Sequence, residues 1–182
     1  MTHQTAYLIH QREHNERTKF AIIMLREHGV CSAPINAKKR LSFFVPYQTI
    51  EKKKQRICLQ EPLGALPPLT GKNLYCGLYL NELIYRSCKP GDHYPEIYDH
   101  YQHSLEAMRN KAPIETSLRQ FEWVVIQACG YSLSAEHITE PFVLFNINDG
   151  LIGTHQPSAN SIPTPSLNNM LQHKQTSHDV KL

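Results

Sequence analysis

Two short basic stretches hold the residues whose types and spacing point to chemistry. Lysine offers a point charge to a phosphate, and arginine adds bidentate contacts and stacking. Three aromatic residues, Phe43, Phe44 and Tyr47, lie between the two stretches and could stack on bases. The pattern predicts a surface for a nucleic acid, with these candidate contacts: Lys38, Lys39, Arg40, Lys52, Lys53, Lys54 and Arg56.

The same residues allow a simpler interpretation, in which the basic loops solubilise the protein and the aromatic residues fill its core. The distribution of charge nevertheless favours an anionic partner. Residues 1–66 contain 11 Lys and Arg against 5 Asp and Glu, whereas residues 67–182 contain 8 against 11. The first part of the chain is therefore strongly basic, although the net charge of the whole chain is only +3.

Two other groups of residues could carry chemistry. Glu96, His100 and His103 share one face of a predicted helix and could bind a metal. Because the chain has 11 histidines, such proximity arises by chance, and a solvated helix face is the simpler interpretation. Arg119 could meet a carboxylate of a partner, or could pack its stem over its own helix. No glycine-rich phosphate loop, GxSxG or HExxH motif is present, so the sequence predicts neither an enzyme nor a metal or other cofactor.

The basic stretches are predicted to lie between short strands. Apolar and β-branched runs alternate with turns at His14–Arg17, Glu27–Gly29 and Glu51–Gln55. Pro46 places the strand in its region after the proline or at a sheet edge. Five strands in so short a segment predict a small closed barrel. The predicted strands are Ala6–His10, Lys19–Arg26, Val30–Ile35, a segment after Pro46, and Arg56–Gln60.

Pro62–Gly71 breaks the strand pattern, and three helices are predicted after it. The first contains Leu74–Arg86, which we expect to be buried on most sides, with Thr70 as its N-cap. The second follows a cap at Asp92 or His93, and the third ends before Gly130. The inward residues are predicted to be Ile97, Tyr101, Leu105 and Met108 on the second helix, and Leu118, Phe121, Val125 and Cys129 on the third.

The chain beyond Gly130 is predicted to be less regular. Residues 142–153 are expected to form a small hairpin that turns at residues 148–150. From His155 onward the chain is polar, and we expect a disordered tail. The predicted fold class is α+β, with a small barrel over residues 1–66, a helical domain with the hairpin over 67–153 and a polar disordered tail over 154–182.

The cysteines and the N-terminus bear on location. No CxxC pair exists, and most of the five cysteines lie in apolar runs, which is typical of reduced thiols in a cytosolic protein. The N-terminus lacks the apolar segment of a signal peptide, and no run approaches the length of a membrane span. We therefore expect a cytoplasmic protein. The cysteines are Cys31, Cys58, Cys76, Cys88 and Cys129.

The order of several motifs resembles that of the bacterial RecO recombination mediators, over about residues 6–133. The motifs are AYLIHQREHNERT, LREHG, a basic loop, LPPLTGKNLYCGLYLNELIYR and SLRQFEWVVIQACGY, and LYCGLYLNELIYR is the most specific of them. The resemblance implies an oligonucleotide-binding (OB) barrel followed by a helical domain. It also implies binding of single- and double-stranded DNA, strand annealing, and loading of RecA, together with RecR, onto DNA coated by single-strand binding protein (SSB).

Several residues take expected roles from this resemblance. Lys38–Arg40 match the basic loop of the family, and Lys52–Lys54 fall at a shortened barrel hairpin. Arg119 matches the first arginine of a block near the site for the SSB C-terminal tail. The helix at Leu74–Arg86 becomes the element that joins barrel and helical domain. Its polar residues, Asn81 and Glu82, become hydrogen-bonding residues within or between the domains.

The chain also departs from the family pattern. Gln120 replaces the second arginine of the SSB block, which weakens the expected contact. Ser134–Pro141 contains no cysteine, so we expect no zinc site of the kind that many relatives carry. The closing helices of the family are missing, which predicts an exposed apolar surface or a need for a partner. The basic loop and the following hairpin are also several residues shorter than in the family. The shortened loops, Gln120 and the missing closing helices favour an alternative hypothesis, a degenerate relative that has lost DNA binding and serves as a protein-interaction module.

Overall fold

The structure is a computed structural model that describes residues 3–52, 56–131, 137–146 and 149–172. The chain forms two compact units, Met1–Gly130 and Tyr131–Leu182. Within the described ranges, no helix combines the length and the apolar character needed to cross a membrane.

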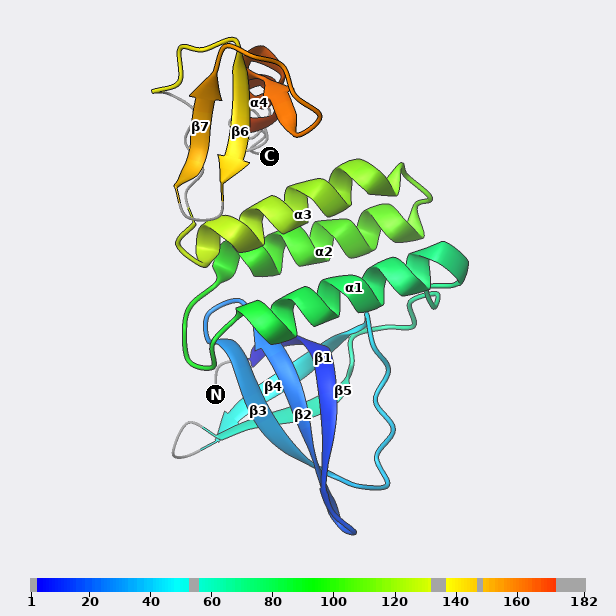
Figure 1. The fold of residues 1–182 in the computed structure, drawn as a ribbon. Coiled ribbons are helices and arrows are strands. Elements are labelled where there is room, and N and C mark those ends of the chain that lie inside the picture. The colour runs from blue at the N-terminus through cyan, green and yellow to red at the C-terminus, as the bar shows by residue number, and fades with distance from the viewer. Residues whose placement is uncertain (1–2, 53–55, 132–136, 147–148, 173–182) are drawn as a thin grey trace. The chain divides into compact units, whose positions relative to one another are not determined.

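The first unit begins with a five-stranded antiparallel sheet, as predicted (Figure 1). Its strands lie in the order β3-β2-β1-β4-β5, and the edge strands β3 and β5 also approach each other. This approach closes the sheet into a small barrel of the OB type, which leaves little free sheet edge. The strands are β1 (His3–Asn15), β2 (Thr18–Leu25), β3 (Gly29–Asn36), β4 (Pro46–Lys52) and β5 (Arg56–Pro62).

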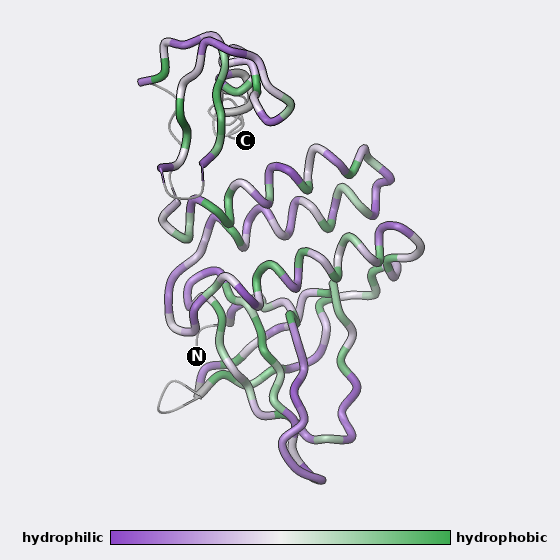
Figure 2. Tube along the Cα trace, in the orientation of Figure 1, coloured by the Kyte–Doolittle hydropathy of each residue, from purple (hydrophilic) through white to green (hydrophobic). Residues whose placement is uncertain are grey.

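Alternating strand residues fill the barrel, because successive side chains of a strand point to opposite faces. The buried residues of this core are Ala6, Leu8, Ala21, Ile23, Leu25, Ala33, Ile35, Tyr47 and Leu59. The β1–β2 hairpin extends beyond the core, and its far end is hydrophilic (Figure 2). The barrel therefore has one polar end, at which the hairpin projects.

Three helices follow the barrel: α1 (Gly71–Ser87), α2 (Pro95–Arg109) and α3 (Ile114–Ala128). Thr70 occupies the N-cap of α1, as predicted, although its side chain makes no capping hydrogen bond. The predicted cap of α2 is wrong, because Tyr94, rather than Asp92 or His93, is the N-cap. The proline that follows Tyr94 has a fixed φ suited to the first turn, so the helix begins there.

The helices pack on the outer face of the sheet and on one another (Figure 1). The four predicted inward residues of α2 are all buried. On α3, Phe121 and Val125 are buried and Leu118 packs against the core, but Cys129 is exposed, so its predicted inward position is wrong. The helix ends at Ala128, and Gly130, with φ +87°, follows the C-cap as the predicted C′ residue.

Helix α1 is buried on one face, which corrects the prediction that it is buried on most sides. Its buried residues are Gly77, Leu80, Asn81 and Ile84. Glu82 faces solvent and pairs with Arg86 one turn later, so its predicted internal role is wrong. Helix α1 exposes several large apolar side chains, as predicted. They are Leu74, Tyr75, Leu78, Tyr79 and Tyr85, which are 36%, 73%, 42%, 41% and 42% exposed.

Asn81 joins α1 to the sheet, which confirms its predicted internal role. Strand β1 carries a bulge, where the pairing register shifts between Leu8 and His10. The amide of Asn81 donates to the carbonyls of Leu8 and Ile9 at 3.4 and 3.1 Å. The hydroxyl of Tyr101 on α2 donates to Asn81 Oδ1 at 2.6 Å. One buried side chain therefore connects the bulge to two helices.

The second unit contains the predicted hairpin, formed by β6 (Phe142–Asn146) and β7 (Gly150–Thr154). Strand β8 (Ser161–Pro163) pairs with β6, and helix α4 (Thr164–Gln172) follows it. Val143 and Leu167 are the buried residues of its small core. The structure thus differs from the expected disordered tail over 161–172, because apolar residues of this stretch pack on the hairpin. Residues 173–182 lie outside the described residues.

Candidate nucleic-acid interface

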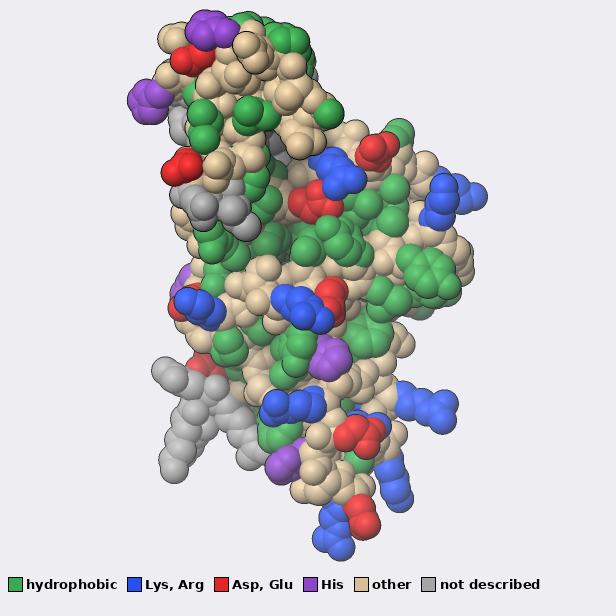
Figure 3. All heavy atoms as spheres, viewed as in Figure 1, with side chains coloured by type: hydrophobic (Ala, Val, Ile, Leu, Met, Phe, Trp, Pro, Cys, Tyr) green, Lys and Arg blue, Asp and Glu red, His purple; other side chains and the backbone are tan. Residues whose placement is uncertain are grey.

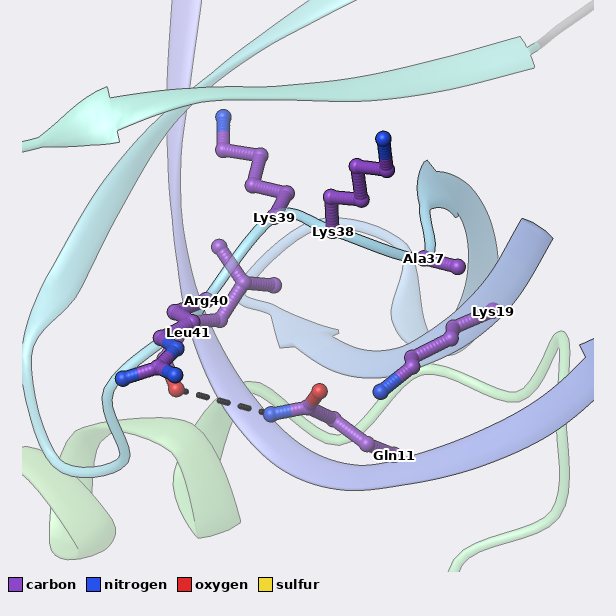
Figure 4. Close-up of a pocket in the computed structure, with 7 residues that line it drawn as sticks. All are labelled: Gln11, Lys19, Ala37, Lys38, Lys39, Arg40 and Leu41. Atoms are coloured by element: carbon purple, nitrogen blue, oxygen red, sulfur yellow. Dashed lines mark hydrogen bonds between the residues drawn. The ribbon is translucent and has the colours of Figure 1, made fainter. Parts of the chain in front are cut away.

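A cavity of about 600 Å³ opens at the polar end of the barrel. Residues of the β1–β2 hairpin line one side, and residues of the β3–β4 loop line the other (Figure 4). Four of the lining side chains are cations, and Figure 3 shows basic side chains around this end of the first unit. We call this site the basic mouth; it consists of Gln11, Lys19, Ala37, Lys38, Lys39, Arg40 and Leu41.

The bulge in β1 sets which hairpin residues reach the basic mouth. Leu8 pairs with Ile23 inside the barrel, and Gln11 pairs with Ala21 on the same inner face. Without the bulge, residues of even number would continue inward, because side chains alternate strictly along a strand. The extra residue therefore turns Gln11 into the cavity, where its amide donates to the carbonyl of Leu41 at 3.5 Å.

The β3–β4 loop is held by short hydrogen bonds at its start. The backbone amide of Ala37 donates to the carbonyl of Arg17 at 3.0 Å, which ties the loop to the hairpin. Asn36 accepts from the amide of Lys38 through its side chain and from the amide of Lys39 through its carbonyl, both at 2.9 Å. These bonds fix the backbone from which the loop cations project.

Two of the three aromatic residues after the loop, Phe44 and Tyr47, anchor it and are closed to bases, whereas Phe43 is half-buried. Phe44 and Tyr47 are only 5% and 3% exposed, so the interpretation that they stack on bases is wrong, and the core interpretation holds for them. The Phe44 ring packs on Gly77 of α1, and its carbonyl accepts a hydrogen bond from Arg109. The Tyr47 hydroxyl accepts from the amide of Ser42 at 2.7 Å.

The cations of the basic mouth differ in how far they are neutralised. Lys19 pairs with Glu13 at 3.0 Å, and Lys39 lies 3.6 Å from Glu61. Lys38 and Arg40 are exposed, and neither has an ion-pair partner among the residues that the structure describes. Exposed cations without acidic partners can neutralise phosphates at little desolvation cost, so Lys38 and Arg40 are the best placed candidates for phosphate contact.

The second basic stretch lies largely outside the described residues. Lys52 ends β4 and pairs with Arg56 at the start of β5, so the stretch belongs to the predicted hairpin. Lys53 and Lys54 lie outside the described residues, as do the side chains of Lys52 and Arg56. Their part in DNA binding stays a prediction.

Lys19 is a member of the basic mouth that the basic-stretch pattern missed. The pairing of the strand that contains Lys19 with the next strand could have revealed its position beside the basic loop. Counting outward from the turn at Glu27–Gly29 pairs Lys19 with Ile35, next to the start of the basic loop. A lysine that is isolated in sequence is thereby brought beside Lys38 and Lys39 in space.

Arg119 lies apart from the basic mouth, on α3. Its guanidinium pairs with Glu122 at 2.6 Å, and the Tyr79 hydroxyl of α1 donates to the other oxygen of the same carboxylate at 2.8 Å. Any partner carboxylate must compete with Glu122. For the predicted metal candidates, the described residues hold no group of three His, Cys, Asp or Glu side chains placed to bind an ion.

The barrel, its cationic end and the attached helices define the class of this protein: an OB-fold barrel with helices packed on one side. Residues 68–139 match the family described as "Recombination protein O C terminal". DNA repair protein RecO of Legionella pneumophila (strain Lens) is 30% identical over 145 residues, 73% of this chain and 63% of that protein. The RecO protein of Pseudoalteromonas atlantica is 30% identical over 72% of this chain and 59% of its own length. The RecO protein of Paraburkholderia xenovorans is 27% identical over 73% of this chain and 48% of its own length.

These matches confirm the resemblance that the motifs predict: this chain is similar to RecO proteins over 72–73% of its length. It spans less than two thirds of the length of these relatives. The named relatives are DNA repair proteins.

Proposed function

We propose that this protein binds DNA in recombinational repair, with the basic mouth as its phosphate-binding site. The observation that carries the proposal is the pair of exposed cations, Lys38 and Arg40, which lack acidic partners among the described residues beside a cavity shared with Lys19 and Lys39. A cluster of this kind on an OB barrel suits a nucleic-acid backbone. The DNA repair names of the similar proteins support the same function.

The finer proposal is a mediator that binds single- and double-stranded DNA, anneals strands, and loads RecA with RecR onto SSB-coated DNA. It acts by binding rather than by catalysis, in the cytoplasm and on the nucleoid. The matched RecO-family segment, residues 68–139, supports this role. On this proposal α1 has an architectural role, because it holds both the bulged strand and the Phe44 end of the basic loop.

A second function, a protein-interaction module without DNA binding, has its own supporting observation. Leu74, Tyr75 and Leu78 present apolar surface on α1, and Tyr79 links this helix to Glu122 and Arg119 on α3. Large exposed apolar side chains beside an arginine suit a short peptide that carries both apolar and acidic residues. The SSB C-terminal tail is the proposed peptide.

The two functions are separated by measuring the fluorescence anisotropy of a labelled single strand and of a labelled SSB-tail peptide. The test variant is Lys38→Ala/Arg40→Ala. The matched control, Lys72→Ala/Lys111→Ala, removes the same charge from exposed residues outside the basic mouth. DNA binding by the wild type and the control, with at least about tenfold weaker binding by the test variant, supports the first function. Peptide binding without DNA binding supports the second.

A further inference from the structure

We propose that the outer face of the β1–β2 hairpin is a base-stacking strip for single-stranded nucleic acid. This inference rests on the proposed DNA binding and adds base contacts to the phosphate contacts of the basic mouth. The strip combines two aromatic residues with three polar residues that have flat side chains. It consists of His10, Arg12, His14, Phe20 and Tyr85.

The bulge that turns Gln11 into the basic mouth also creates the strip. After the register shift, His10 pairs with Ile22 and Arg12 pairs with Phe20. Side chains of cross-strand partners share a face, so His10, Arg12 and Phe20 lie on the outer face of the sheet. The same two strands therefore carry phosphate-binding groups on one face and ring systems on the other.

The rings of the strip support one another. The centroids of the His10 and Tyr85 rings lie 4.6 Å apart, with an angle of 34° between the ring planes. The His14 ring lies 4.9 Å from the Phe20 ring, and the Arg12 guanidinium lies 6.0 Å from the same ring. Contacts of this kind hold flat groups in place at the surface, so little side-chain entropy remains to be lost on binding.

These flat groups remain accessible to a ligand. His10, Arg12 and His14 are exposed, and Tyr85 is 42% exposed. Two nearby carboxylates are already occupied, because Glu13 pairs with Lys19 and Glu82 pairs with Arg86. Arg12 has no acidic partner among the described residues, so it is available to a phosphate or to the face of a base.

The spacing of the strip selects a single strand. Alternate residues of a β-strand lie about 7 Å apart, roughly twice the 3.4 Å between successive nucleotides along one strand of a duplex. A DNA strand whose bases stack at both ends of the strip must therefore be extended and unpaired. Bases within a duplex have no free faces, so double-stranded DNA reaches the basic mouth but not the strip.

The test compares two labelled oligonucleotides of equal length and charge, one of thymidines and one with abasic sugars throughout. The wild type is expected to bind the thymidine strand at least about fivefold more tightly, because each stacked base contributes to affinity. His10→Thr/Arg12→Thr/His14→Thr/Tyr85→Leu is expected to bring this ratio close to one. Threonine keeps the preference for a strand, and leucine keeps apolar contact. Lys38→Ala/Arg40→Ala is expected to weaken binding of both ligands and to keep the ratio.

The outcomes separate this inference from the proposed function. If the wild type binds neither ligand, the proposed function fails. If the wild type binds both ligands equally, the stacking strip is overturned while DNA binding stands. If the fourfold variant keeps the wild-type ratio of affinities for the thymidine and abasic strands, the strip is overturned as well. Circular dichroism shows whether the fourfold variant is folded. If the fourfold variant does not fold, Tyr85→Leu, which changes one surface residue of α1, provides the test, and a ratio equal to that of the wild type overturns the strip.

Discussion

The hydroxyl of Tyr101 donates a 2.6 Å hydrogen bond to the side-chain oxygen of Asn81, in the buried contact between α1 and α2. The amide of the same Asn81 donates to the carbonyls of Leu8 and Ile9 at the bulge of β1. The bulge decides which hairpin residues reach the basic mouth and which reach the outer strip. Two buried side chains of the helices thus stabilise the strand geometry on which both proposed DNA contacts depend.

Tyr101→Phe is expected to lower the free energy of unfolding by about 1–3 kcal/mol, because Asn81 Oδ1 then loses its donor inside the protein. Urea unfolding followed by circular dichroism measures the change. Tyr75→Phe, which removes a hydroxyl from a residue that is 73% exposed, serves as the control and is expected to change little. Equal stability of the Tyr101→Phe variant and the wild type would contradict the role of this hydrogen bond.

Gly77→Ala is expected to weaken both stability and DNA binding. An added Cβ would lie 2.8 Å from the Phe44 ring and 3.0 Å from Leu69, so the Phe44 segment must move. Overpacking of this kind costs about 1–3 kcal/mol, and the displaced segment continues into the basic loop. Thermal unfolding and single-strand titration measure the two effects. Cys76→Ala, which changes the neighbouring half-buried residue, is the control for DNA binding. If Gly77→Ala and this control bind the single strand with equal affinity, the packing of α1 on Phe44 does not influence the basic loop, and the prediction is contradicted.

Stability is expected to fall in mildly alkaline solution. Burial, with a smaller contribution from Cys129, raises the pKa of the Cys88 thiol to about 12 from an ordinary value of 9.0. Below pH 9 the thiol is protonated in both states, so its contribution to stability is fully present. Between pH 9 and pH 12 the unfolded chain loses this proton and the folded chain keeps it, so stability falls by at most about 1.4 kcal/mol per pH unit.

The measurement is the free energy of unfolding at pH 8, 9 and 10 for the wild type and Cys88→Ala. The variant has a cavity and is less stable at every pH, but its loss between pH 9 and 10 is expected to be smaller. An identical decline in both proteins would show that Cys88 does not contribute.

Glu122→Gln and Arg119→Ala are expected to act in opposite directions on binding of an SSB-tail peptide. Removing the Glu122 charge releases Arg119 from its 2.6 Å ion pair, so the peptide is expected to bind more tightly. Arg119→Ala removes the cation and is expected to weaken binding by up to about fivefold, as for an exposed ion pair. Isothermal titration calorimetry checks both. A change in the same direction for the two variants would exclude competition between Glu122 and the peptide.

The regular elements of the first unit were predictable from local patterns, whereas β8 and α4 of the second unit were not. The five strands and three helices follow from apolar periodicity and from turn residues such as Gly29 and Gly130, because each signal lies within a few neighbouring residues. The exposure of α1 was not predictable from its composition, because a helix with apolar residues all round gives no indication of which faces meet a partner. The exposed ring of Tyr75 illustrates this limit.

The candidate site was predictable in part. Lys38, Lys39 and Arg40 are adjacent in sequence and stay adjacent in the basic mouth, whereas Lys19 joins them only through strand pairing. The burial of Phe44 depends on Gly77 and Arg109, which are 33 and 65 residues away, so local pattern alone did not distinguish a core ring from a stacking ring. The bulge at Ile9 was equally hidden, because Asn81 stabilises it from a distant helix.

The measurement that tests the central claim most directly is the salt dependence of single-strand binding by the wild type and by Lys38→Ala/Arg40→Ala. Release of counterions from phosphates makes the logarithm of affinity fall with the logarithm of salt concentration, by about 0.7 per phosphate neutralised on a single strand. We predict a steep negative slope for the wild type and a slope shallower by about 1.4 for the variant, since two phosphate contacts are lost. Absence of binding by the wild type, or equal slopes for the two proteins, would contradict the assignment of the basic mouth.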